Sequence, residues 1–212
     1  MWFPTKITPI FLLLTNSPTT LSFKYDYVTC GSLIKLYSQS YQTRLHSHEV
    51  AYGTGSGQQS VTAIEQADDS NSLWQIRGIS EDNACTRGEP IQCGASVRLT
   101  HLNTKKNLHT HNFRSPLSNQ QEVSAFGENG VGDDLDVWEI QCSTGQWNRN
   151  SGVSLYHSPT KKFLALSGKV FGRPIANQME VIASKSKQLW KVMEGVYIKP
   201  TMTEEDMEHD EL

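Results

Sequence analysis

The chain has 212 residues, with 19 Lys and Arg residues against 22 Asp and Glu residues. Six of the acidic residues lie from Glu204 onward, so the rest of the chain is close to neutral. A near-neutral body gives no reason to expect nucleic acid or an anionic membrane as a partner. The length suits one compact domain with a buried core.

Residues 1–22 have the pattern of a secretory signal peptide. Lys6 supplies a weak positive charge, residues 7–15 form an apolar run, and small polar residues follow as far as Ser22. The run is shorter than the roughly 20 apolar residues that a membrane-spanning helix needs. We therefore expect a cleaved signal rather than a membrane anchor or a buried strand, with cleavage near Ser22. No later stretch is apolar enough to span a membrane, so no membrane insertion is expected.

The body of the chain contains three repeats, at about 31–84, 94–146 and 151–200. Each repeat opens with an alternating apolar pair, reaches a leucine nine residues later, continues to a valine and closes on a tryptophan. These landmarks are Leu45, Leu108 and Leu164, Val61, Val123 and Val181, and Trp74, Trp138 and Trp190. Self-similarity of this kind indicates a repeat architecture.

Each landmark lies in a short run of period two, which is typical of a half-buried strand. Turn-forming segments separate the runs, at 53–57, 115–118 and 172–174, and no window favours an amphipathic helix of ten residues. This predicts an all-β fold with about four strands per repeat. A propeller usually needs at least four blades, and an open stack would expose edge strands. Closure about a pseudo-threefold axis predicts a β-trefoil over 28–200, in which six barrel strands are capped by three hairpins.

Four cysteines in a secretory chain favour disulfides over zinc or a thiol nucleophile. Cys30 and Cys93 each precede a glycine where the first and second repeats begin, and Cys85 and Cys142 follow the closing tryptophans. The first and last strands of one trefoil repeat run close together. The expected pairs are therefore Cys30–Cys85 and Cys93–Cys142, and the third repeat has none.

The most conspicuous polar motifs are two histidine pairs, which are His46 with His48 and His109 with His111. Because Leu45 and Leu108 are expected to point inward, alternation sends these histidines to the opposite face. Paired imidazoles can hold a metal, act as acid and base, or sense pH. The third repeat, however, has Ala165 and Ser167 at the matching positions. We interpret the pairs as surface or turn-bracing residues, and as a candidate partner surface because they break the threefold symmetry.

Two other polar segments have structural interpretations. The glycine-rich segment 53–57 lacks the Gly-Lys-Ser/Thr ending and the following helix of a phosphate loop, so a tight β-turn is expected. The acidic clusters at 68–71 and 133–136 lack EF-hand spacing and are interpreted as solvated turn residues. No acid, base and nucleophile can be assigned to one pocket. We therefore predict no enzyme activity, no bound metal and no cofactor.

Residues 201–212 are interpreted as a flexible acidic tail. Its last four residues are His209, Asp210, Glu211 and Leu212. They match the address read by the KDEL/HDEL receptor, which predicts a protein of the endoplasmic reticulum lumen.

Several segments of the chain resemble the stromal cell-derived factor 2 family. They are 44–48, 55–62, 69–74, 121–127 and 194–197, with the C-terminal address, and the likeness extends over about 28–200. The resemblance implies three MIR repeats, a module shared with protein O-mannosyltransferases and with inositol trisphosphate and ryanodine receptors, in a β-trefoil without catalytic residues. It also implies endoplasmic reticulum quality control, in complex with a luminal Hsp40 co-chaperone and its Hsp70, on unfolded client proteins. The histidine motif departs from the family pattern in the third repeat.

A second hypothesis is a carbohydrate-binding module that acts on O-mannosylated glycoproteins. Trefoils often bind sugars in shallow sites with an aromatic platform, for which Trp147 or Tyr156 is the candidate. An O-mannosyltransferase activity is not expected, because the chain lacks the membrane spans of those enzymes.

Overall fold

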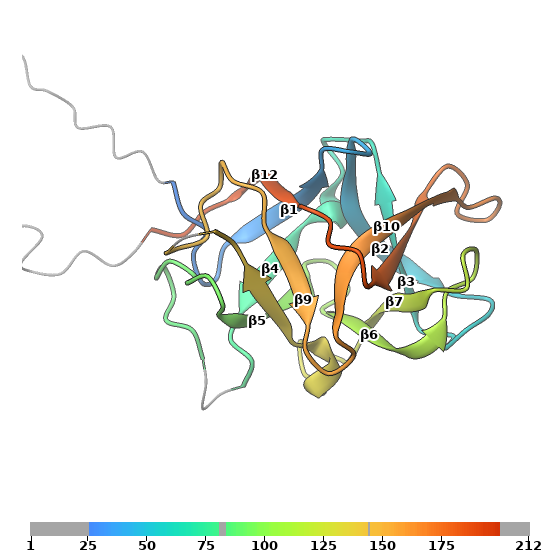
Figure 1. The fold of residues 1–212 in the computed structure, drawn as a ribbon, viewed down its shortest axis with the longest axis horizontal. Helices are drawn as coiled ribbons and strands as arrows, with labels where there is room; N and C mark the ends of the chain where they lie inside the picture. The colour runs from blue at the N-terminus through green and yellow to red at the C-terminus, as the bar shows by residue number, and fades with distance from the viewer. Residues whose placement is uncertain (1–25, 81–83, 144, 200–212) are drawn as a thin grey trace, which may run out of the picture.

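A computed structural model of the chain describes residues 26–80, 84–143 and 145–199. Within these ranges the protein is all-β, with two single-turn 3₁₀ helices, as Figure 1 shows. The predicted signal peptide at 1–22 and the predicted tail at 201–212 lie outside the described residues. No helix of the described ranges has the length and apolar character needed to cross a bilayer.

The strands of the described ranges fall into three sets of four, one set per predicted repeat. The first repeat contains β1 (Leu33–Ser38), β2 (Thr43–Ala51), β3 (Gln59–Ile64), η1 (Ser70–Ser72) and β4 (Trp74–Arg77). The second contains β5 (Ser96–His101), β6 (Asn107–Arg114), β7 (Gln121–Phe126), η2 (Asp134–Asp136) and β8 (Trp138–Gln141). The third contains β9 (Ser154–His157), β10 (Lys162–Val170), β11 (Met179–Ser184) and β12 (Lys191–Val196).

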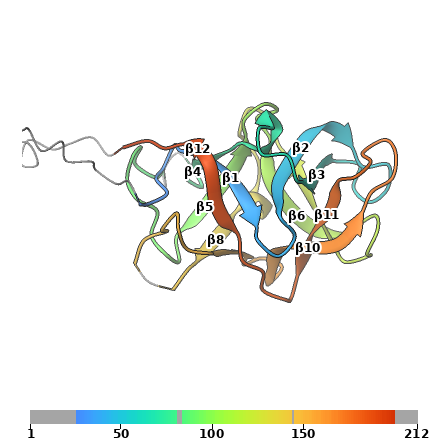
Figure 2. The ribbon, with the colours of Figure 1, turned by 90° about the horizontal axis from the view of Figure 1, so that it is seen from above.

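Six strands form a closed barrel. Strand β1 pairs with β12 and β4, β4 with β5, β5 with β8, and β8 with β9. A bridge between Val153 and Trp190 completes the ring next to β9 and β12. Figures 1 and 2 both show β12 running beside β1, so the end of the third repeat meets the start of the first.

The other six strands form three hairpins that cap the barrel. The hairpins are β2–β3, β6–β7 and β10–β11. Strands β3, β7 and β11 also pair with one another, which ties the hairpins into one cap. This arrangement is the predicted β-trefoil.

The landmark residues of the sequence form the core. The three leucines, the three valines and the three closing tryptophans have no exposed surface. A buried indole N–H needs an acceptor, and each tryptophan finds one on the leucine of its own repeat. Trp74 Nε1 donates to the Leu45 carbonyl (3.1 Å), Trp138 to that of Leu108 (2.9 Å) and Trp190 to that of Leu164 (3.0 Å). The repeated leucine, valine and tryptophan therefore form the same buried packing arrangement in each of the three repeats.

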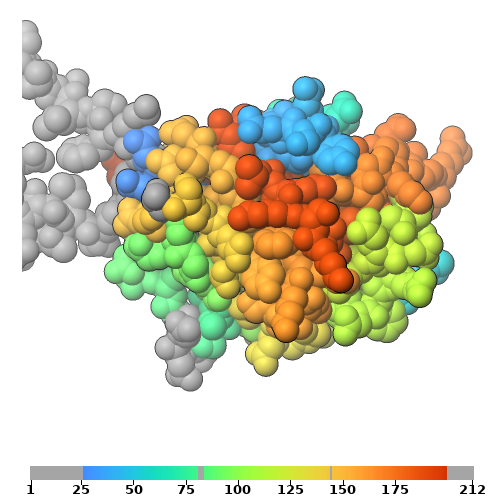
Figure 3. Space-filling model, viewed as in Figure 1, coloured from blue at the N-terminus to red at the C-terminus, as the bar shows by residue number. Residues whose placement is uncertain are grey.

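The ends of the repeats are closed in two ways. Disulfides join Cys30 to Cys85 and Cys93 to Cys142, which are the predicted pairs. The third repeat is closed onto the first by hydrogen bonds instead. Ile198 accepts from Thr29 Oγ1 (2.6 Å), and its amide donates to Ser32 Oγ (3.1 Å). Figure 3 shows β12 and the loop before it, in red, on the surface between the blue start of the first repeat and the orange third repeat.

The glycine-rich segment forms the predicted tight turn. It connects β2 to β3, and Gly55 and Gly57 have φ values of +76° and +70°. Side chains other than glycine rarely adopt this conformation, so the glycines here serve the backbone of the turn.

Candidate functional site

In the first repeat the histidine pair forms a hydrogen-bonded line with Asp69. His46 Nδ1–H donates to Asp69 Oδ2 at 2.9 Å, and His46 Nε2 lies 2.9 Å from His48 Nδ1. Ser72, in η1, donates to the same Asp69 oxygen at 2.7 Å. Burial raises the pKa of Asp69, but the hydrogen bonds from Ser72 and His46 outweigh it and leave that pKa below its ordinary value. The carboxylate therefore ties the turn before β4 to the outer face of β2.

In the second repeat the histidine–aspartate pair is more deeply buried, but His109 Nε2 has no hydrogen-bond partner within the described part of the chain, so no hydrogen bond joins the two histidines. His109 Nδ1–H donates to Asp136 Oδ1 at 2.9 Å, and these side chains are 1% and 0% exposed. Asp136 Oδ2 accepts from Asn107 Nδ2 (3.1 Å) and from the amide of Asp133 (2.9 Å). The His109 and His111 rings meet edge-on, with 4.8 Å between centroids. Every oxygen of Asp136 is thus used within the protein.

The third repeat ties the same two elements together without histidine. Gln188, two residues before Trp190, occupies the position of Asp136 relative to the closing tryptophan. Its side chain accepts from the Leu166 amide (2.9 Å) and donates to the Leu166 carbonyl (3.0 Å). Ala165, in the place of His109, has too short a side chain to make this link itself.

The contacts of the histidine pairs favour bracing over chemistry. Ser60 Oγ lies 3.3 Å from His48 Nε2, which gives the order serine, histidine, histidine and aspartate of a nucleophile relay. Ser60, however, is 1% exposed, and its hydroxyl donates to the Val50 carbonyl at 2.8 Å. In the second repeat, ligand atoms of His109, Asp133 and Asp136 lie within 4.8 Å of one another. A cation there would compete with the hydrogen bonds that Asp136 already accepts.

Of the two predicted roles, surface or turn-bracing, His46 and His109 have the bracing role, and the prediction that they contribute to an exposed partner surface is wrong. His46 and His109 are 4% and 1% exposed, because η1 and η2 cover the outer faces of β2 and β6. The acidic clusters are likewise not fully solvated, since Asp136 has no exposed surface. His48 and His111 are partly exposed, and burial lowers the pKa of each imidazole. Their contact with a partner stays a prediction.

Two further histidines, His101 and His157, end β5 and β9 and were not singled out by the sequence. His101 Nε2–H donates to the Asn71 carbonyl oxygen (2.9 Å), and its Nδ1 accepts from the Thr104 hydroxyl (2.8 Å). His157 is held in the same way by Thr160 (2.7 Å) and the Leu135 carbonyl (3.1 Å). Burial lowers the pKa of both imidazoles to about 4. The signal in the sequence was their shared position, four residues after the start of each apolar pair.

Two buried carboxylates, also missed by the sequence reasoning, anchor the hairpin tips. Glu180 Oε1 accepts from the amides of Leu117 (2.7 Å) and Ser118 (3.2 Å) in the tip of β6–β7. Glu122 accepts from the hydroxyl of Ser56 and, at 3.3 Å, from its amide, in the tip of β2–β3. Both glutamates have no exposed surface. Alternation alone places them on an outer face, and only the neighbouring hairpin buries them.

A cavity of about 420 Å³, here called the hairpin cavity, lies where the hairpins meet. It is lined by side chains of all three repeats, among them Val50, Tyr52, Leu117, Phe171, Pro174 and Ile175. The buried Tyr52 hydroxyl lies 2.8 Å from the Val61 carbonyl oxygen and 3.0 Å from that of Val123. Burial raises the pKa of Tyr52 above its ordinary value, so the phenol stays protonated.

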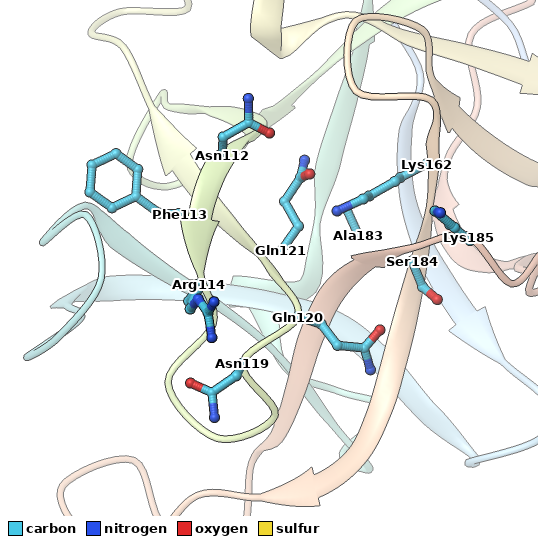
Figure 4. Close-up of a pocket in the computed structure, with 10 residues that line it drawn as sticks. All are labelled: Asn112, Phe113, Arg114, Asn119, Gln120, Gln121, Lys162, Ala183, Ser184 and Lys185. Carbon is cyan, nitrogen blue, oxygen red and sulfur yellow. The ribbon is translucent and has the colours of Figure 1, made fainter.

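Two surface grooves occupy equivalent places beside the hairpins. The first groove, of about 530 Å³, is lined by residues that include Glu49, Ala51, Gln58, Gln59, Lys106 and Phe126. The second groove, of about 480 Å³, includes Asn112, Arg114, Gln120, Gln121, Lys162 and Lys185, as Figure 4 shows.

Of the two predicted aromatic platforms, burial rules out Trp147, and Tyr156 is partly exposed. Trp147 is fully buried, so it cannot offer a face to a ligand. The Tyr156 ring packs against Phe163 with 5.0 Å between centroids.

Known proteins share both the sequence and this architecture. The MIR domain family matches residues 43–151. Stromal cell-derived factor 2-like protein 1 of Homo sapiens is 53% identical over 190 residues, which are 88% of this chain and 85% of that protein. The chain belongs to the stromal cell-derived factor 2 family.

Solved structures agree with membership of the stromal cell-derived factor 2 family. The crystal structure of the SDF2-like protein from Arabidopsis thaliana has a TM-score of 0.79 and 37% identity, over 83% of this chain and 99% of that chain. A chain of the S. cerevisiae protein O-mannosyltransferase complex bound to the sugar donor has a TM-score of 0.73 and 28% identity, over 84% of this chain and 26% of that chain. The family and the two disulfides indicate a secreted or endoplasmic reticulum luminal protein.

Proposed function

We propose that this stromal cell-derived factor 2 family member is a non-enzymatic quality-control factor of the endoplasmic reticulum lumen. It binds a luminal Hsp40 co-chaperone and assists Hsp70-dependent folding or retention of unfolded client proteins. The KDEL/HDEL receptor retrieves it through residues 209–212. The observation that carries the proposal is the hairpin cavity, an apolar site on a scaffold whose buried polar groups largely brace the fold.

The walls of the hairpin cavity support contact with apolar chain segments. Val50 is 36% exposed, and Phe171 and Ile175 are partly exposed beside it. Exposed apolar patches on soluble proteins commonly mark interaction sites. An unfolded client offers apolar side chains to such a patch, and their burial is favourable by about 25 cal/mol per Å².

The test measures the aggregation of a denatured client by light scattering, with purified luminal Hsp40, Hsp70 and ATP. We expect the wild-type chain to lower the scattering, and a Val50→Ser/Phe171→Ser double variant to lose at least half of that effect. Val131→Ser is the matched control, because Val131 is 71% exposed and does not line the cavity. A wild-type chain without effect, or a double variant as active as Val131→Ser, would contradict the proposal.

The alternative is a carbohydrate-binding module for O-mannosylated glycoproteins. It is favoured by the structural likeness to the O-mannosyltransferase complex bound to the sugar donor. Binding of neutral mannosides on a glycan array, without any effect on client aggregation, would favour this alternative.

A further inference from the structure

The two grooves are built on the same polar frame. In the first groove, Gln59 Nε2 donates to Ser47 (2.7 Å) and Thr104 (2.9 Å). In the second groove, Gln121 Nε2 donates to Thr110 (2.9 Å) and Thr160 (3.0 Å). Each glutamine thus joins the hairpin of one repeat to the start of the next repeat. The two grooves can therefore be compared directly, because they share this hydrogen-bonded frame and differ in the side chains that line them.

The third junction has no equivalent frame. Met179 stands in the place of the glutamine, and Tyr41 stands in the place of the threonine. The Tyr41 side chain lies against Gly168, where an added Cβ would be 3.4 Å from the tyrosine oxygen. An aromatic ring therefore lies where the other two junctions have a threonine.

The two grooves differ in charge. Both contain a lysine at one position, Lys106 in the first groove and Lys162 in the second. The first groove balances it with Glu49, where the second has Asn112. The second groove adds Arg114 and Lys185, so three cationic side chains line it without a carboxylate.

The cations of the second groove have no carboxylate partner in the described ranges. No ion pair there involves Arg114, Lys162 or Lys185. Burial and the neighbouring Lys185 lower the pKa of Lys162. Figure 4 shows Arg114 on one side of Gln121 and the two lysines on the other. The fold thus holds like charges around one hollow, where an anion would relieve their repulsion.

The second groove also contains an unused hydrogen-bond acceptor. Gln121 is 4% exposed, and its Oε1 has no hydrogen-bond partner among the described residues. Because Nε2 is committed to two threonines, Oε1 is fixed in place. Buried acceptors of this kind normally receive a donor. A chloride ion or a carboxylate has no donor to offer, whereas a sugar hydroxyl does. The amides of Asn112 and Gln120 in the lining add donors and acceptors.

We propose that the second groove binds a small anionic sugar, namely a hexose that carries a phosphate or a carboxylate. Arg114, Lys162 and Lys185 hold the anionic group. Gln121 Oε1, which is buried in the free chain, accepts from a ring hydroxyl when the side chains over it move aside. This ligand differs from the neutral mannosides of the alternative function, and the site does not depend on Hsp40 binding.

The test is calorimetric titration of the full chain with glucose 6-phosphate and with glucuronate. We expect saturable binding of at least one of them that weakens as salt is raised, and at least tenfold weaker binding of glucose and of inorganic phosphate. Arg114→Ala and Lys185→Gln change exposed side chains and should each weaken binding at least fivefold. Lys106→Met, in the first groove, is the matched control and should leave binding unchanged.

Three results would overturn the proposal. The first is no binding of either anionic sugar by a wild-type chain that has a cooperative thermal transition. The second is inorganic phosphate or an acidic peptide binding as tightly as the anionic sugars, which would make the groove a general anion site. The third is an equal loss of binding in Lys106→Met and Lys185→Gln.

Discussion

In the second repeat, the turn before the closing tryptophan is tied to the hairpin by a buried pair, His109 and Asp136, whereas the third repeat uses the neutral side chain of Gln188. The first repeat is intermediate in its chemistry. Asp69 accepts from His46 and from Ser72, and Ser72 stands at the position of Asp136. Each repeat has a hydrogen-bonded link between its hairpin and the turn before the closing tryptophan, but the side chains that form this link differ. The histidine pairs are therefore variants of a brace that the third repeat makes without histidine.

The largest expected effect comes from breaking the buried pair of the second repeat. Asp136→Ala leaves His109, Asn107 and the Asp133 amide without their shared partner. We expect the free energy of unfolding to fall by about 3–4 kcal/mol, measured by urea denaturation. Asp69→Ala is the matched change in the first repeat and should cost less, because the Asp69 side chain is 19% exposed. Equal losses at the two sites would contradict this ranking.

The disulfides separate the first two repeats from the third. Replacing Cys93 and Cys142 by serine removes a link between residues 49 positions apart. We expect a loss of about 2–4 kcal/mol in the free energy of unfolding, with the fold retained, because the third repeat is closed without a disulfide. A variant that lacks the β-sheet circular dichroism of the wild type would show that the second repeat depends on its disulfide for folding.

A pH titration addresses a position that the second and third repeats share. His101 and His157 have pKa values of about 4 in the folded protein, against about 6.5 in an unfolded chain. The unfolded state therefore binds more protons between these values, and stability falls as the pH is lowered from 6.5 to 4. We expect each histidine to contribute about 2–3 kcal/mol to this loss. His157→Asn should flatten the curve of unfolding free energy against pH, and an unchanged slope would contradict the assignment.

The smallest effect is expected in the third repeat. Gln188→Ala removes two hydrogen bonds to the Leu166 backbone, which should cost about 1–2 kcal/mol in urea denaturation. Gln188→Glu tests the same junction, because it retains the acceptor for the Leu166 amide and loses the donor. A loss as large as that of Asp136→Ala would show that the neutral link is no weaker than the buried pair.

The fold was predictable from the sequence because its core is local and repeated. The leucine, valine and tryptophan of the first repeat, Leu45, Val61 and Trp74, have equivalents in the same order in the other two repeats. The trefoil then brings the paired cysteines together. The burial of His109 and Glu122 was not predictable, because period two places both on an outer face. A 3₁₀ turn covers the first, and the tip of another hairpin covers the second. Trp147 was misjudged as a possible platform because its burial also depends on distant segments.

The unequal grooves were also beyond the sequence alone. Arg114, Lys162 and Lys185 are far apart in the chain, and only the junction of two repeats brings them to one hollow. The repeat pattern identifies Lys106 and Lys162 as equivalent positions, but it does not identify the charged side chains that line each groove with them.

Binding to the co-chaperone is tested most directly by titrating the purified luminal Hsp40 into this chain by isothermal calorimetry, with and without mannose. We expect a saturable complex of defined stoichiometry that forms without sugar and is unchanged by mannose. No heat of binding to a functional Hsp40, or a complex that forms only when a glycan is present, would contradict this expectation.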